Sequence, residues 1–184
     1  MSHFEFIMLM LTIIIGLGLA ELLTNVARQI KAGKVSKPYW VQSIVVATIL
    51  IALLQQWWES WGLQQVDNWS FPIVLMLMLP SIGLFIISHL LFPEKIEGAD
   101  LKEHYFAIMK KTWIIGSLVV ISATLFRPVA FGLPLWDMNN LSSLFTLLIF
   151  LILAFSKNQR TSEVLAPILF VVMMADILVF SLTI

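Results

Sequence analysis

The sequence predicts an all-α integral membrane protein, a bundle of six transmembrane helices with a short interfacial helix before the fourth span. Three observations lead to this class. Hydrophobic residues make up 60% of the 184 residues, charged residues 12%, and the mean hydropathy is +0.96. The apolar residues gather in runs long enough to cross a bilayer. The segments between these runs are alternately rich and poor in Lys and Arg, as expected of a polytopic membrane protein.

The runs define a single transmembrane domain over residues 1–184 that contains one charged cytoplasmic connector, residues 93–111. A helix needs about 20 apolar residues to cross the hydrocarbon core, and each run is close to that length. The spans are expected at about residues 6–24, 40–61, 71–92, 112–127, 138–156 and 163–184.

Residues at the ends of the first two spans and inside the third support their assignment. No Lys or Arg precedes the apolar run that begins at Phe6, which is the reverse of a secretory signal peptide, so we expect a retained span. The second run follows Pro38 and opens with two interfacial aromatic residues. In the third, Pro80 lacks the amide that the carbonyl of Met76 would accept, which predicts a helix kink.

The last three spans follow the same logic. Residues 101–111 can form the interfacial helix, and the fourth span should end at Arg127 because the proline that follows disfavours helical geometry there. Asp137 can cap the fifth span. The sixth has Pro167 in its first turns and Asp176 inside it.

The basic residues set the orientation. Every Lys and Arg except Arg127 falls in the loops after the first, third and fifth spans, and cytoplasmic loops are enriched in these residues. Both termini are therefore expected on the extracytoplasmic side. The net charge of +0 gives no general attraction for nucleic acid, and the absence of cysteine excludes disulfides and thiolate metal sites.

The end of the second span combines polar and aromatic residues. Gln55 and Glu59 share one helical stripe, while Trp57 and Trp61 lie almost opposite. The indoles suit the outer membrane interface. The amide of Gln55 and the carboxylate of Glu59 need polar neighbours.

The predicted topology places most polar side chains of the spans in the outer half of the bundle. Arg127 is the only basic residue among them, so at least one of Glu59, Asp176 and Glu5 should pair with it. One carboxylate would make a structural ion pair. Three would leave surplus acids able to carry protons or hold a cation. The candidate ion- or proton-handling residues are Asp176, Glu59, Arg127, Glu5 and Gln55, supported by Asn139, Ser143 and Thr146.

Enzyme signatures are absent. The chain has no HExxH, no GxSxG and no glycine-rich phosphate loop, and its three histidines show no metal-ligand spacing. We therefore expect no catalytic residues, no metal and no cofactor. Glu21 and His89 lie near the cytoplasmic ends of their spans, where a histidine is usually interfacial or a cap.

Several segments resemble small bacterial multispanning membrane proteins of about six helices. They are Phe4-Glu5-Phe6, Gly16-Leu17-Gly18-Leu19, Pro38-Tyr39-Trp40 and the stretch from Gln55 to Trp61. The resemblance covers the first two and a half spans. It implies a bacterial inner membrane as the location and supplies neither an activity nor site residues.

Three functions compete. The first is a membrane permeation protein, an ion or proton channel or small transporter, which we expect to be a homo-oligomer in the lipid bilayer. The second is a non-catalytic membrane subunit or sensor that docks a cytoplasmic protein partner through residues 93–111. The third is an intramembrane enzyme that acts on lipid. The surplus acids favour the first.

Overall fold

The computed structural model describes residues 2–33, 36–66, 68–132, 134, 138–156 and 158–180, without the side chains of Arg127, residues 138–141 and Phe180. The all-helical class is confirmed, because these ranges contain helices and one isolated bridge, Lys37 to Asp100, but no strand. The elements are α1 (His3–Ala32), α2 (Trp40–Glu59), the 3-10 helix η2 (Ser60–Gln65), α3 (Phe71–Leu90), α4 (Leu101–Phe131), α5 (Met138–Phe155) and α6 (Gln159–Phe180).

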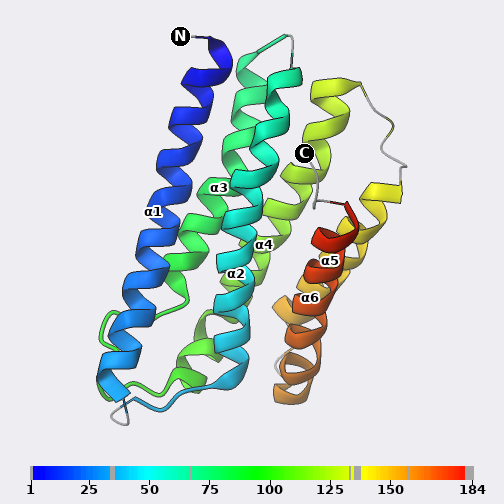
Figure 1. Cartoon of the computed structure of the whole chain (residues 1–184). Helices are drawn as coiled ribbons and strands as arrows, with labels where there is room; N and C mark the ends of the chain where they lie inside the picture. Colours follow the sequence, from blue (N-terminus) through cyan, green and yellow to red (C-terminus); the bar gives the residue numbers. More distant parts are fainter. Residues whose placement is uncertain are drawn as a thin grey trace.

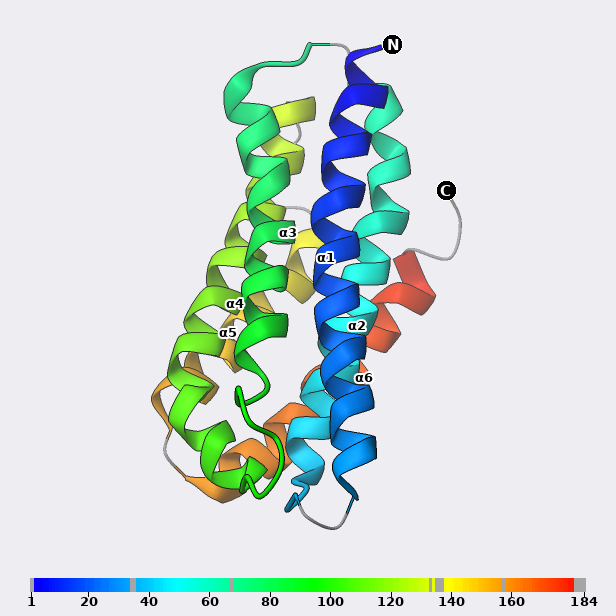
Figure 2. The same cartoon turned by 90° about the vertical axis from the view of Figure 1, so that its left-hand side faces the viewer.

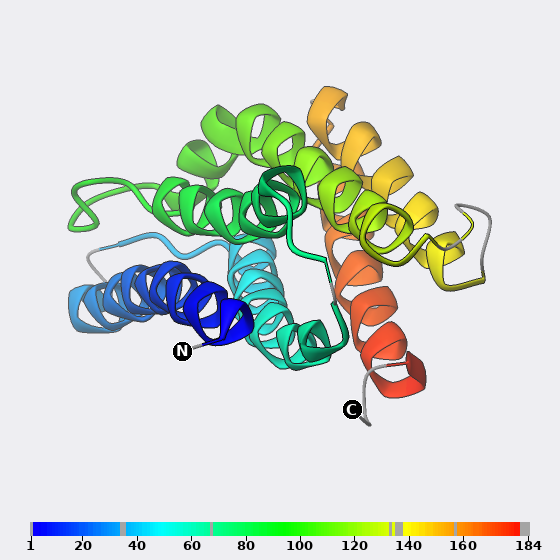
Figure 3. The ribbon, with the colours of Figure 1, turned by 90° about the horizontal axis from the view of Figure 1, so that it is seen from above.

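The six α-helices form two layers of three. Helices α1, α2 and α6 make one layer and α3, α4 and α5 make the other (Figure 3). Neighbouring helices pack against each other within each layer. Between the layers, α1 packs on α3, α2 packs on α3 and α4, and α6 packs on α5. The pairs α1–α2, α3–α4 and α5–α6 are joined toward the same end, the lower end in Figure 1. The N-terminus lies at the opposite, upper end (Figure 1).

Helix α4 differs from the expected arrangement at both of its ends. It is one continuous helix of 31 residues, so the interfacial helix expected over residues 101–111 is not a separate element. Asp100 caps its first turn, and the sequence has no glycine or proline before Gly116 to interrupt it. The helix also continues through Pro128 and ends at Gly132, whose φ of 65° is left-handed. Its true stop signal is this glycine.

Close helix contacts depend on glycines. A Cβ at Gly83 of α3 would overlap the Cγ2 methyl of Val119 on α4, and one at Gly116 would lie 2.7 Å from Cε2 of Phe150 on α5. The glycine of α1 that makes a contact is Gly18, whose hypothetical Cβ would be 3.1 Å from Leu53, whereas Gly16 faces open space. Pro80 lies within α3, which runs unbroken from Phe71 to Leu90.

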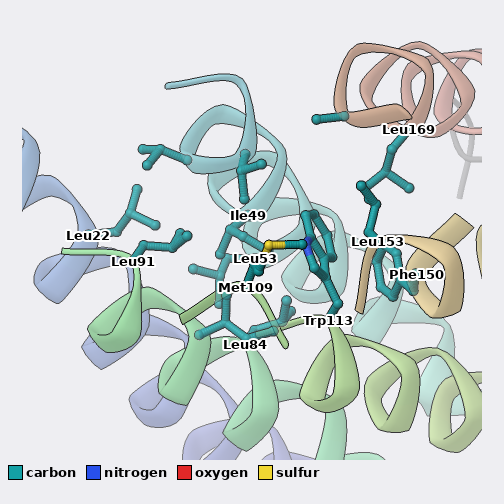
Figure 4. Packing of buried hydrophobic residues seen from close by; sticks show 14 of the residues in the cluster. Leu22, Ile49, Leu53, Leu84, Leu91, Met109, Trp113, Phe150, Leu153 and Leu169 are labelled. Carbon is teal, nitrogen blue, oxygen red and sulfur yellow. The ribbon is translucent and has the colours of Figure 1, made fainter. Parts of the chain in front are cut away.

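The core between the layers is apolar. Trp113 of α4 is 2% exposed and lies between Leu53 of α2 and Phe150 of α5 (Figure 4). Its indole contacts the Phe150 ring at a centroid distance of 5.1 Å. Among the described side chains, the buried polar ones are serines, one threonine on α2, one on α4, Asn25 and Gln42, and none is charged.

Five of the helices are long and apolar enough to cross a membrane, α1, α2 with η2, α3, α4 and α6. The described part of α5 that was assessed, Ser142–Phe155, is apolar but shorter. Its expected cap, Asp137, lies outside the described residues. Many large apolar side chains point outward from these helices, including Leu17, Leu118 and Val171, each more than half exposed.

Candidate functional site

Two of the acidic residues expected in the outer cluster, Glu5 and Glu59, make contacts within their own helices. Glu5 forms a capping box with Ser2 at the start of α1, accepting from the Ser2 backbone amide at 2.9 Å. On α2, Nε2 of Gln55 donates to Oε1 of Glu59 at 2.8 Å, and Glu59 is exposed. The structure therefore brings Gln55 and Glu59 together and holds Glu5 at a helix end.

The remaining members of that cluster lie on α4, α5 and α6. Asp176 is half-buried near the end of α6, and Arg127 belongs to α4. The side chains of Arg127 and Asn139 lie outside the description. Ser143 and Thr146 are half-buried on α5, which packs on both α4 and α6.

A polar pocket of about 210 Å³ lies instead at the lower end of α1 and α3. These two helices run side by side (Figure 2). We call it the lower-end pocket. Its lining is Glu21, Asn25 and Arg28 from α1, His89 from α3, and Phe92, Pro93 and Glu94 from the segment after α3.

A network of side chains forms one wall of the pocket. Nδ1 of His89 lies 2.9 Å from Oε1 of Glu21, joining α3 to α1. Nδ2 of Asn25 donates to the same carboxylate oxygen at 3.0 Å, and Nη1 of Arg28 donates to Oδ1 of Asn25 at 3.5 Å. Because a carboxylate only accepts, His89 carries a proton on Nδ1. Asn25 is 5% exposed and is fixed by both neighbours.

Helix geometry explains why these residues converge. Glu21, Asn25 and Arg28 are spaced i, i+4 and i+7, so they share one face of α1. One turn before Glu21, a Cβ at Gly18 would lie 3.5 Å from Cα of Phe85, an ordinary van der Waals distance, so α1 and α3 are packed against each other here. His89 lies one turn after Phe85 on α3. Glu21 and His89 therefore face each other across the contact between these two helices.

Two side chains fix the end of α3 beside the pocket. The last carbonyls of a helix have no partner within it. Nε2 of Gln42, from α2, donates to the Leu91 carbonyl at 2.6 Å, and Nε2 of His104, from α4, donates to the Leu90 carbonyl at 3.0 Å. The C-terminal end of α3 is thus held by both neighbouring helices.

The two connectors at this end are also bonded to each other. The Lys37 amide donates to the Ala99 carbonyl and the Leu101 amide donates to the Lys37 carbonyl, each at 3.1 Å. Nζ of Lys37 lies 3.5 Å from Oδ2 of Asp100. The backbone amides of Glu103 and Lys102 donate hydrogen bonds to the Asp100 carboxylate. The bond from Glu103 contributes most to lowering the pKa of this carboxyl, followed by the bond from Lys102 and the charge of Lys37.

The lining suits a ligand that carries both signs of charge. Glu21 is already engaged by His89 and Asn25. Arg28 has five N–H donors, and only the long bond to Asn25 uses one of them among the described residues. Glu94 is exposed and makes no hydrogen bond or ion pair with another described residue. A guanidinium with unused donors and an exposed carboxylate therefore line one pocket.

Sequence reasoning noted Glu21 and His89 but did not join them. The available signal was the polar stripe Glu21, Asn25 and Arg28, which continues one helical face beyond the apolar run. The topology also placed Glu21 and His89 at the same depth. Within the described residues no three His, Asp or Glu side chains are grouped to hold a metal ion. Comparisons with protein-family models, curated proteins and solved structures gave no match.

Proposed function

We propose that this protein is an integral membrane subunit or sensor that works by binding, with its binding surfaces at the lower end. The observation that carries the proposal is that polar side chains from different helices converge at this end, around the lower-end pocket and the joined connectors. The described core between the layers is filled by apolar side chains such as Trp113 and Leu53. The five long apolar helices support placement in a bilayer.

The lower end also offers a charged surface for a protein partner. Lys102, Glu103, Lys110 and Lys111 are exposed along the first turns of α4, and Lys95 and Glu97 are exposed in the preceding connector. Contacts in this region hold the backbone in place, because Asp100 caps α4 and bonds to Lys37. A fixed array of charges suits docking, since less ordering entropy is lost on binding.

The test measures membrane insertion, transport and binding separately. The protein should remain in membranes after alkaline carbonate washing, and liposomes containing it should pass ions and protons no faster than empty liposomes. Site-specific crosslinkers at Glu97 should yield one discrete adduct in cells. Replacing Lys102, Lys110 and Lys111 with Gln should remove that adduct, whereas Arg160→Gln, exposed on α6, should leave it unchanged. Extraction by carbonate, or an adduct insensitive to the charge changes, would overturn the proposal.

A permeation protein is the second candidate, and one observation favours it. Gln55 and Glu59 are polar groups on α2, Asp176 is half-buried on α6, and these two apolar helices pack together. Ionisable groups at membrane depth need water or a polar partner. At Asp176 a second copy of the chain would supply polar groups, giving a homo-oligomer with a polar path between copies.

Flux through liposomes decides between the candidates. If the chain conducts, flux should exceed that of empty liposomes under a proton or cation gradient, and Asp176→Asn should reduce it at least several-fold. The control is Glu163→Gln, an exchange of the same kind at the other end of α6, where Glu163 accepts from Gln159 at 2.6 Å. Equal flux with and without protein would exclude this candidate.

A further inference from the structure

We propose that the lower-end pocket binds the head group of a phospholipid that bears both a phosphate and a primary ammonium group, with the lipid's acyl chains lying along α1 and α3. This inference rests on the proposed function, because a lipid ligand requires these helices to lie in a bilayer. It names the ligand class of the same site.

The size of the pocket fits a head group. Its volume of about 210 Å³ corresponds to about seven water molecules at about 30 Å³ each. Pockets that enclose drug-sized ligands are larger, about 300–1,000 Å³. A phosphate linked to a two-carbon amine is within the available space.

The charges in the pocket match a zwitterion. Arg28 has unused donors in a fixed planar fork, which is suited to phosphate oxygens. Glu94, on the segment after α3, is an exposed carboxylate in the pocket lining and accepts from an ammonium. Because Glu21 is engaged by His89 and Asn25, the groups left for a head group are Arg28 and Glu94, and a purely anionic head group would meet the Glu94 carboxylate as well as the guanidinium. The pocket therefore favours a ligand that brings its own cation.

The same lining favours a primary ammonium over a quaternary one. Quaternary ammonium groups are recognised by cages of aromatic faces. The pocket has a single aromatic residue, Phe92, which is 6% exposed. A primary ammonium has three N–H donors, and the exposed carboxylate of Glu94 is an acceptor for them.

An apolar surface leads away from the pocket toward the upper end. Leu17 precedes Glu21 by one turn on α1 and is 54% exposed, and Ile86 precedes His89 by one turn on α3 and is 40% exposed. Ile82, one turn further, is 37% exposed. Residues at these spacings lie on the same helix face as the pocket residues. A polar pocket with exposed apolar residues on one side is the shape of a phospholipid site.

The experiment measures lipid binding to the full-length purified protein. Delipidated protein in detergent is titrated with phosphatidylethanolamine, phosphatidylcholine and phosphatidylglycerol of matched acyl chains, with bound lipid counted by native mass spectrometry and stability followed by thermal unfolding. Phosphatidylethanolamine should bind about tenfold more tightly than the other two, as one charge-assisted hydrogen bond implies. Free phosphoethanolamine is titrated in parallel.

Variants assign the contacts. Glu94→Gln should remove the preference for phosphatidylethanolamine over phosphatidylcholine, and Arg28→Gln should weaken both about tenfold. Glu97→Gln and Lys31→Gln, exposed neighbours that do not line the pocket, should match the wild type. Equal binding of all three lipids, or an unchanged preference in Glu94→Gln, would overturn the inference.

Further outcomes separate a failure of the lipid site from a failure of the proposed function. Free phosphoethanolamine that binds as tightly as the lipid would show that the acyl chains contribute nothing, which overturns the lipid as ligand. Protein that resists carbonate extraction but shows no lipid preference would contradict this inference and leave the proposed function standing. Protein released by carbonate would contradict the proposed function itself.

Discussion

Asp100 joins three parts of the lower end through one carboxylate. It accepts from the amides of Lys102 and Glu103 at the start of α4 and lies 3.5 Å from Nζ of Lys37 on the connector between α1 and α2. These contacts all favour its charged form, which is why its pKa lies below the usual value of 3.8. The stability of the folded protein should therefore depend on this ionisation.

The first prediction concerns acid. A carboxyl whose pKa is lowered on folding contributes stability that is present above the unfolded pKa, near 3.8, and is lost as the pH falls through the lower folded pKa. Between pH 5 and pH 3, the wild type should lose more thermal stability than Asp100→Asn. Asparagine keeps the helix cap but does not titrate. Parallel melting curves for the two proteins across this range would contradict the assignment.

The second prediction concerns Gln42, which is 2% exposed. Its amide donates to the Leu91 carbonyl at 2.6 Å, so Gln42→Leu leaves a buried acceptor without a partner. This should reduce the free energy of unfolding in detergent by about 1–3 kcal/mol. Gln55→Leu on the same helix removes a half-buried amide whose partner, Glu59, is exposed, and should change stability by less than half as much. A smaller loss for Gln42→Leu than for Gln55→Leu would refute the cap.

At the scale of elements, the contact between α3 and α4 depends on a missing side chain. A Cβ at Gly83 would overlap a methyl of Val119. Gly83→Ala should therefore destabilise the protein, since forcing an extra carbon into a packed contact costs about 1–3 kcal/mol and exceeds the gain of about 0.5–1 kcal/mol in helix propensity. Chemical unfolding of purified protein measures the change.

Gly16→Ala is the matched control. Gly16 has nothing within 4 Å of its hypothetical Cβ, so only the propensity gain applies and the variant should be as stable as the wild type or more stable. If both variants change stability equally, the close approach of α3 and α4 is not the cause.

Features of the helices that depend on the local sequence could be predicted, whereas those that depend on contacts between distant residues could not. Each apolar run found by hydropathy overlaps a described helix, because a run of apolar residues is a property of the local sequence. Hydropathy could not choose between Gly16 and Gly18 as the contact residue of α1, since that choice depends on where Leu53 and Phe85 lie. The stop of α4 was misplaced for a similar reason. Pro128 disfavours a helix locally, yet the helix continues to the left-handed Gly132.

At the scale of the whole molecule, the arrangement assigns each connector to one of two ends. The chain has no cysteine, so single introduced cysteines report their side of the membrane without background. Cysteine at Glu97, exposed at the lower end, should react with a membrane-impermeant thiol reagent only after cells are opened. Cysteine at Gln64, exposed in η2 near the upper end, should react in intact cells. Labelling of both positions from the same side would overturn the orientation.

The candidate site was only partly predictable at this scale. The predicted topology places Glu21 and His89 near the cytoplasmic ends of their spans, but depth does not determine which helices are neighbours. We expect at least one of Glu59, Asp176 and Glu5 to pair with Arg127, whose side chain lies outside the description, so that pairing stays a prediction. The lateral order of helices depends on packing between residues distant in the sequence, such as Trp113 and Phe150, and a single sequence does not reveal it.

The bonds between the two connectors also constrain how the protein is made. The Lys37 backbone pairs with Ala99 and Leu101, which are synthesised only after α2 and α3 are complete. When only α1 and α2 have been synthesised, the backbone of Lys37 therefore still lacks its partners Ala99 and Leu101. Helices α5 and α6 arrive last and join α4 and α2, which are by then in place. Biogenesis of this fold should thus proceed through a four-helix stage that the last hairpin completes.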